Sequence, residues 1–183
     1  MTLTELAKKY SSDKLFRHSY LPTYERILGQ REVRRLLELG IGYASLMKPF
    51  LPEGIEYCHG SSLRMWTEYW PEAEIYACDI RPDALINEGN IKSWVADQSS
   101  EHDLQRLVSN CGSKLDVIID DGSHQFEHQK LSARVLLPWL NKGGVYVIED
   151  TYEDKGAEMA AMFGGQLVIG TKTPDDCLVI IER

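Results

Sequence analysis

The sequence has no long hydrophobic run and few cysteines, and both scarcities exclude classes of protein. No apolar stretch reaches the roughly 18 residues that a membrane span requires, and residues 1–9 lack the apolar segment of a signal peptide. The four cysteines are far apart, without the C-x-x-C spacing of zinc or redox sites. We therefore expect a cytoplasmic protein with no membrane partner, in which Cys78 and Cys177 are reduced and buried within strands.

Clustered positive charge is also scarce. The chain carries a net charge of −8 and a pI of about 5.1, and its only basic cluster is Arg31, Arg34 and Arg35. Because phosphate binding depends on clustered Lys and Arg, this balance predicts no nucleic-acid partner. A chain of 183 residues without repeats or a Pro/Ser-rich linker is the size of one domain, so we expect a single domain over residues 1–183.

Segments typical of strands and helices alternate after two N-terminal helical segments, 3–10 and 21–28. This alternation predicts parallel strands with helices on both faces of the sheet. The last two strand-like runs lie too close for a helical crossover and predict an antiparallel hairpin. The fold class is thus α/β: a single Rossmann-like, doubly wound sheet of about seven strands, mostly parallel with a C-terminal antiparallel hairpin, as in class I methyltransferases. Strands are expected over 34–39, 74–79, 92–96, 115–120, 144–149, 166–170 and 177–181, and helices over 62–70, 101–110, 125–137 and 157–163.

A glycine loop follows the first strand, with Glu38, Gly40 and Gly42 in the run E-L-G-I-G. Glycines allow a tight turn and a close approach of backbone to ligand. The third glycine of a dinucleotide fingerprint is replaced by Ser45, which weakens the case for NAD. An acid before the glycines suits a cofactor with an ammonium group and no pyrophosphate, which is S-adenosylmethionine.

Acids also end the next two strands. Asp79 is placed to accept hydrogen bonds from ribose hydroxyls, and Asp97 from an adenine amino group. Each acid alone is also explained as a helix cap or a turn residue. Their occurrence at the ends of successive strands favours a cofactor cleft.

The stretch 117–128, V-I-I-D-D-G-S-H-Q-F-E-H, is the most informative. A buried strand ends in two acids, and a second apolar run, 145–148, ends in Glu149 and Asp150. In open α/β sheets the ligand crevice lies at the carboxyl ends of such strands. Neighbouring carboxylates beside His124 therefore predict a divalent-metal site with a general base.

The segment 124–128 also matches H-x-x-E-H, the signature of an inverted zinc peptidase. That alternative requires His124 and His128 on one helix, with Glu127 as base. D-D-G-S places His124 at a strand-to-helix turn instead, and we expect a structural role for His128.

Six segments of the chain resemble a metal-dependent family of sugar O-methyltransferases from antibiotic pathways, such as those of mycinamicin and tylosin. The specific ones are S-L-R-M-W and the D-D-G-S-H segment with its downstream I-E-D. The segments occur in the family's order, at residues 12–26, 36–42, 61–80, 96–98, 118–124 and 143–151.

The resemblance implies S-adenosylmethionine and Mg²⁺ as cofactors, and a small hydroxylated molecule as substrate. It implies catalytic roles for His124, as base, and Asp121. Residues 1–30, with Lys14, His18 and Tyr20, correspond to an N-terminal helical lid. The implied metal ligands are Asp121, Glu149 and Asp150, and the implied cofactor contacts are Glu38, Gly40, Ser62, Asp79, Ile80, Asp97, Gln98 and Asp120, with Ser61 as a further candidate.

Two departures concern the acceptor. The extra N-terminal domain of the macrolide enzymes has no counterpart here, and residues 43–60 differ from the family's glycine-rich stretch. They indicate a smaller or different acceptor, or a pocket that another subunit of a homo-oligomer completes. A catechol-type O-methyltransferase and a non-catalytic S-adenosylmethionine-binding module remain as alternatives.

Overall fold

A seven-stranded sheet organises the computed structural model, which describes residues 1–183. Its strands run in the order β3-β2-β1-β4-β5-β7-β6, so the order reverses between β1 and β4. The first five strands pair in parallel, whereas β7 pairs antiparallel with both β5 and β6. The predicted doubly wound sheet and C-terminal antiparallel hairpin are confirmed. The strands are β1 (Arg35–Leu39), β2 (Glu74–Asp79), β3 (Ile91–Val95), β4 (Leu115–Asp120), β5 (Leu140–Thr151), β6 (Gln166–Ile169) and β7 (Cys177–Glu182).

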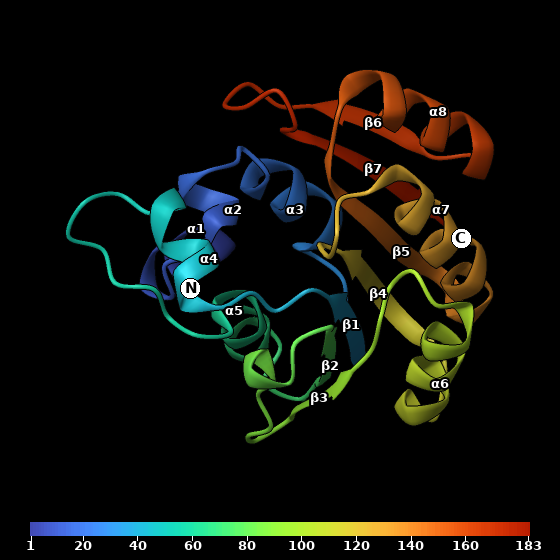
Figure 1. Ribbon diagram of the computed structural model, residues 1–183, viewed down its shortest axis with the longest axis horizontal. Coiled ribbons are helices and arrows are strands. Elements are labelled where there is room, and N and C mark those ends of the chain that lie inside the picture. The colour runs from blue at the N-terminus through green and yellow to red at the C-terminus, as the bar shows by residue number, and fades with distance from the viewer.

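Helices cover both faces of the sheet. Figure 1 shows α1 to α5 on one side and α6 to α8 on the other. The predicted helices are all present, with ends shifted by a few residues; two short ones, α2 and α4, were not predicted. The helices are α1 (Leu3–Lys9), α2 (Asp13–Phe16), α3 (Leu21–Leu28), α4 (Ala44–Met47), α5 (Ser61–Tyr69), α6 (Glu101–Cys111), α7 (Phe126–Leu136) and α8 (Glu153–Phe163), with 3₁₀ turns η1 (Lys48–Phe50), η2 (Pro82–Ala84) and η3 (Leu137–Trp139).

The central strands are buried on both faces, which explains their continuous apolar character. Successive side chains of a strand point to opposite faces. Val145 and Val147 of β5 accordingly pack in the core beneath α1, α3 and α5, whereas Tyr146 and Ile148 pack in the core beneath α6, α7 and α8. The same alternation determines toward which face of the sheet the acids at the strand ends point.

The N-terminal segment, predicted as a lid, packs into the core. Leu3, Leu6, Tyr24 and Leu28 are buried in the core on the α5 side of the sheet. Among residues 1–30, only Asp13 and Arg17 line the main cavity. The apolar faces of α1 and α3 need cover from water, and packing against the sheet provides it.

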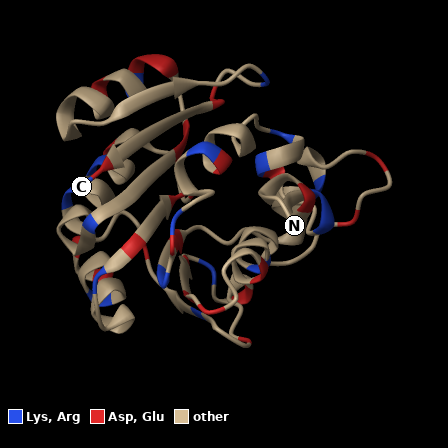
Figure 2. Ribbon diagram, turned by 180° about the vertical axis from the view of Figure 1, so that it is seen from behind, with Lys and Arg blue, Asp and Glu red and all other residues tan.

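Charged residues and cysteines fit the sequence-based expectations. Lys and Arg are spread among acidic residues along the ribbon (Figure 2). Cys78 and Cys177 are free thiols buried in β2 and β7. None of the helices combines the length and the apolar character that crossing a bilayer demands.

Candidate active site

A cavity of about 480 Å³ lies at the carboxyl ends of the parallel strands. This is the position where open α/β sheets bind their ligands. Most of the predicted site residues lie on its wall, and Glu38, Asp120 and Glu149 do not. Those on the wall are Gly40, Ser61, Ser62, Asp79, Ile80, Asp97, Gln98, Asp121, His124 and Asp150.

The glycine loop is fixed by contacts that leave no room for a side chain. Gly40 has φ +91°, and a Cβ built there would lie 1.9 Å from the carbonyl oxygen of Asp121. The Asp79 Oδ2 accepts hydrogen bonds from the amides of Ile41 (3.0 Å) and Gly42 (3.3 Å). Asp79, predicted from the sequence as a cofactor contact, therefore also shapes the loop at the cavity mouth.

Asp120, predicted as a cofactor contact, lies behind the cavity wall in this structure. Its carboxylate is fully buried and accepts hydrogen bonds from Gln98 Nε2 (2.6 Å) and the Tyr146 hydroxyl (3.2 Å). Burial raises the pKa of Asp120 to about 6, against the lowering effect of these hydrogen bonds. Gln98 in turn accepts from the Ser123 amide at 2.8 Å. Asp120 thus positions Gln98, which does line the cavity.

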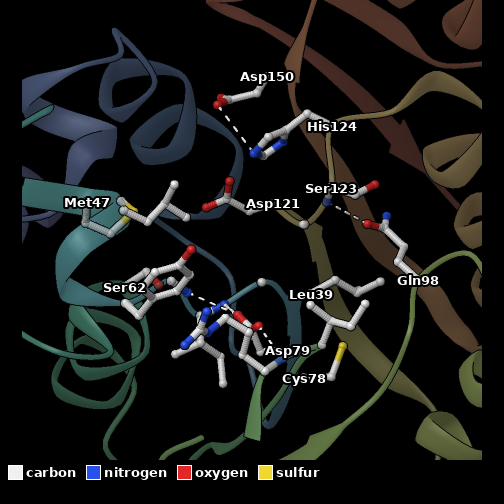
Figure 3. Close-up of a pocket in the computed structure, with 18 of the residues that line it drawn as sticks. Leu39, Met47, Ser62, Cys78, Asp79, Gln98, Asp121, Ser123, His124 and Asp150 are labelled. Atoms are coloured by element: carbon white, nitrogen blue, oxygen red, sulfur yellow. Dashed lines mark hydrogen bonds and ion pairs between the residues drawn. The ribbon is translucent and has the colours of Figure 1, made fainter. Parts of the chain in front are cut away.

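Asp121, His124 and Asp150 form the acidic side of the cavity, and their ligand atoms all lie within 4.8 Å of one another. In Figure 3 their side chains converge, and His124 Nε2 lies 3.9 Å from Asp150 Oδ2. His124 (φ +56°) and Asp150 (φ +54°) both adopt the left-handed conformation that non-glycine residues avoid. Such strain persists where the surrounding structure holds it, and it is common at functional sites.

Asp150 is held by two aromatic residues from the N-terminal segment. The Tyr20 hydroxyl donates to Asp150 Oδ1 at 2.7 Å, and His18 Nε2 lies 3.3 Å from Oδ2. The His18 and Tyr20 rings are stacked, with centroids 4.6 Å apart. Burial opposes ionisation, but interactions with His18, His124 and Tyr20 outweigh it and lower the pKa of Asp150 to about 2. The carboxylate is therefore anionic and oriented.

Glu149, which the sequence predicts as a metal ligand, is not on the cavity wall in this structure. It shares the face of β5 that bears Val145 and Val147, so its buried side chain points toward the N-terminal helices. There its oxygens accept hydrogen bonds from Lys14 Nζ, at 2.7 and 2.8 Å, and one from the Tyr24 hydroxyl. An irregular register between Ile148 and Thr151 frees Asp150 to turn into the cavity.

Glu38, predicted as a cofactor contact, is likewise not on the cavity wall in this structure. It lies on the α5 side of β1, fully buried, and accepts a hydrogen bond from Trp66 Nε1 at 2.7 Å. Its other oxygen lies 3.3 Å from Lys14 Nζ.

The zinc-peptidase alternative does not fit the geometry. His124 precedes α7, which begins at Phe126, so the two histidines do not share a helix. Glu127 is exposed and pairs with Lys130. His128 does line the cavity, but its Nδ1 is engaged with the Ser123 hydroxyl at 2.9 Å.

Comparison with known proteins identifies the relatives of this chain, although no family model matches it. It is 35% identical over 159 residues to mycinamicin VI 2''-O-methyltransferase of Micromonospora griseorubida. It is 36% identical over 153 residues to a tetracenomycin rhamnosyl 3'-O-methyltransferase of Streptomyces olivaceus. Each match covers 82% of this chain. The chain is a relative of the sugar O-methyltransferases.

The similarity to a solved structure extends over the whole length of this chain. MycE methyltransferase, in complex with Mg, SAH and mycinamycin VI, covers 100% of the chain with a TM-score of 0.74 and 26% identity. The resemblance and the class I methyltransferase fold predicted from the sequence are confirmed. The chain spans only 36% and 37% of the two curated relatives and 53% of the MycE chain.

The ligand atoms of Asp121, His124 and Asp150 are of the kinds that bind a divalent cation. Asp121 and Asp150 offer carboxylate oxygens, the ligands that Mg²⁺ prefers, and both face the cavity. His124 adds an imidazole within the same 4.8 Å group. Its side chain is 40% exposed, so it is accessible to a ligand in the cavity.

One wall of the cavity is apolar, and none of its residues was predicted as a site residue. Tyr43, Leu46, Met47 and Phe50, on and beside the two short turns α4 and η1, lie along it. Leu46 and Phe50 are 46% and 38% exposed, although both are large and apolar. The only available signal was the presence of these residues in the segment that departs from the family pattern.

Proposed function

We propose that residues 1–183 form one methyltransferase domain. It would transfer a methyl group from S-adenosylmethionine to a hydroxyl of a sugar or small polyhydroxylated natural product, with Mg²⁺ assistance. The observation that carries the proposal is the convergence of Asp121, His124 and Asp150 beside the glycine-loop cavity. The relatives' names add the substrate class, since they describe methylation of glycosylated macrolides and tetracenomycins.

Different residues of the cavity wall are assigned to the two substrates. We assign Ser61, Ser62, Asp79, Ile80, Asp97 and Gln98 to the methyl donor. Figure 3 shows Asp121, His124 and Asp150 together, away from Ser62 and Asp79, and we assign these three to the acceptor. The acceptor would enter between the cluster and the apolar wall at 43–50, which can contact the less polar part of a glycoside.

S-adenosylmethionine, when bound, supplies an electrophilic methyl group on a sulfonium, and Mg²⁺, when bound, stabilises the acceptor oxygen as its proton leaves. Asp121 and Asp150 would hold the ion. His124 would accept the proton of the acceptor hydroxyl as the new C–O bond forms and the C–S bond breaks. The cluster would also speed the transfer by holding the acceptor oxygen in line with the methyl carbon.

The test is methyl transfer by the full chain to a panel of glycosides, free sugars and catechols, with Mg²⁺ or with EDTA. We expect transfer to a sugar hydroxyl that EDTA abolishes. Asp121→Ala should remove the metal-stimulated turnover and leave affinity for S-adenosylhomocysteine largely intact. The exposed Asp154→Ala serves as the matched control.

Three results would contradict the proposal. Turnover by Asp121→Ala in the presence of EDTA would contradict the metal assignment. Transfer to catechols alone would indicate the catechol-type chemistry. Affinity for S-adenosylhomocysteine without transfer to any acceptor would indicate a binding module.

A further inference from the structure

The segment 43–50, which carries the apolar wall of the cavity, has no core of its own. Its two turns α4 and η1 contain no buried residue, and a helix of four residues is too short to be stable by itself. Leu46 and Phe50 lie on the cavity wall although they are 46% and 38% exposed. Contacts with other parts of the chain therefore have to hold this segment in place.

Phe50 is held by Arg17, the one cation that residues 1–30 contribute to the cavity wall. The guanidinium carbon of Arg17 lies 4.1 Å from the centre of the Phe50 ring, and Arg17 Nη2 donates to Asp175 Oδ2 at 2.8 Å. The Arg17 Nε is buried without a hydrogen-bond partner. Loss of water from a cation strengthens its attraction to an aromatic face. One guanidinium thus joins the end of α2, the turn before β7 and the segment 43–50.

The other end of the segment is fixed by the glycine loop. Tyr43 follows Gly42 directly, and its ring centre lies 4.2 Å from the guanidinium carbon of Arg81. Met47 packs on the same loop, since a Cβ built at Gly42 would lie 3.1 Å from its Sδ. Phe50 lies beyond these contacts, so its support comes from Arg17.

We propose that Arg17 is a positioning residue that holds Phe50 at the cavity wall, and that Phe50 is a specificity-determining residue that favours acceptors with an apolar group beside the sugar. Such a group, laid on Phe50 and Leu46, would remove exposed apolar surface from water. A free sugar has no apolar group to place there. The inference rests on the proposed transfer to a sugar hydroxyl and adds which side chains of this chain choose among acceptors.

The first experiment measures kcat and KM of the full chain with two acceptors: the glycoside of an apolar aglycone that it methylates best, and the free sugar which that glycoside contains. Phe50→Ala removes the ring from the cavity wall. We expect KM for the glycoside to rise ~10-fold, with its kcat, the kcat/KM of the free sugar and the affinity for S-adenosylhomocysteine unchanged. Ile55→Ala is the matched control, since Ile55 is also 38% exposed and lies in the same loop outside the cavity wall. An equal loss of kcat/KM for both acceptors would contradict a role of Phe50 in selection.

The role of Arg17 is tested with Arg17→Lys, which keeps the charge and loses the planar guanidinium that stacks on the ring. We expect KM for the glycoside to rise, by less than in Phe50→Ala. Because Arg17 acts through Phe50, Arg17→Lys should have no further effect when Phe50 is already replaced by alanine. Arg26→Lys, an exposed change of the same kind, is the control. An equal effect of Arg17→Lys with and without the Phe50 ring would overturn the positioning role.

Hydrogen exchange gives a readout that needs no acceptor. The Leu51 amide donates to the Lys48 carbonyl at 3.2 Å across the η1 turn, and it should exchange faster in Arg17→Lys than in the parent chain. Phe50→Leu, which keeps an apolar side chain and removes the ring, should reproduce this change and replaces Arg17→Lys if that variant does not fold. Unchanged exchange would overturn the proposal.

The outcome is separable from that of the proposed function. If the parent chain transfers methyl to no sugar acceptor, the proposed function fails, and hydrogen exchange alone decides whether Arg17 holds Phe50. If the parent chain methylates the apolar glycoside and the variants keep its KM, only the inference about Arg17 and Phe50 fails.

Discussion

The hydroxyl of Tyr20 makes two hydrogen bonds to Asp150, donating to Oδ1 at 2.7 Å and accepting from the backbone amide at 3.1 Å. The same side chain therefore orients the carboxylate and holds the backbone of a residue at φ +54°. A residue 130 positions earlier in the chain thus fixes the geometry of one acid of the cluster.

Tyr20→Phe removes both hydrogen bonds and leaves the ring packing. We expect a loss of about 2 kcal/mol in the free energy of unfolding, because a buried charge-assisted bond and an amide partner are lost. Weaker Mg²⁺ binding should accompany it. Urea unfolding and calorimetry measure the two effects. Tyr69→Phe, whose hydroxyl makes one long bond to the Gly29 carbonyl at 3.4 Å, is the control. Equal Mg²⁺ affinity in Tyr20→Phe and the parent would show that Asp150 needs no such support.

Gly40→Ala tests the approach of the glycine loop to Asp121. The left-handed conformation costs an alanine about 1–2 kcal/mol, and the Cβ would also lie 1.9 Å from the Asp121 carbonyl. We expect a total loss of roughly 3 kcal/mol or more and loss of S-adenosylhomocysteine binding. Gly54→Ala has a similar φ of +82° with nothing within 4 Å, so it should show the conformational cost alone. If both variants lose the same stability, the close contact is unimportant.

Asp79→Asn separates the two sides of the cavity. The change weakens the hydrogen bonds that the carboxylate accepts from the Ile41 and Gly42 amides and removes its charge. S-adenosylhomocysteine binding should weaken by at least ~10-fold, the effect of about 1.4 kcal/mol, while Mg²⁺ binding stays unchanged. Asp83→Asn, an exposed acid paired with Arg81, is the control. An equal loss of Mg²⁺ affinity would mean that the two sides are not independent.

Asp176 should make stability depend on acid pH. Burial opposes ionisation, but hydrogen bonds from Ser19, Lys172 and Thr171 outweigh it and lower the pKa of Asp176. Since the folded pKa lies below the unfolded value of about 3.9, its stabilisation is complete above that pH and is lost as pH falls through the folded pKa. Asp176→Asn should therefore cost about 2–4 kcal/mol at pH 7 and progressively less as the pH falls below about 3.9.

Denaturant unfolding at several pH values measures this difference. The exposed Asp154→Asn should show no such dependence on pH. A cost for Asp176→Asn that is the same at pH 3 and pH 7 would rule out ionisation as its source.

The sequence allowed the sheet, its hairpin and most of the cavity wall to be predicted, because hydrophobic runs and turn residues are local signals. The directions of Glu38 and Glu149 were not predicted. Glu38 points to the same face of the sheet as Leu36, and Glu149 to the same face as Val147, because side chains alternate along a strand. Which of the two faces the N-terminal helices cover depends on tertiary packing, which local sequence does not reveal. Asp150 breaks parity through an irregular register and a positive φ, and an aspartate carries no local signal for either. The burial of Lys14 among three acids is likewise not visible in the sequence, where a lysine is normally a surface residue.

The insertion of β7 between β5 and β6 has a consequence for the order in which the site can form during synthesis. Asp176 precedes β7 and holds Ser19, while His18 lies between Asp176 and Asp150. The first and last segments of the chain thus meet around one acid of the cluster. A nascent chain that has emerged only as far as β5 already contains Asp121, His124 and Asp150, yet lacks the C-terminal support of His18. The complete arrangement around Asp150 therefore requires residues 175–182, and truncations that remove β7 and the preceding Asp176 should impair the cluster although they remove none of its members.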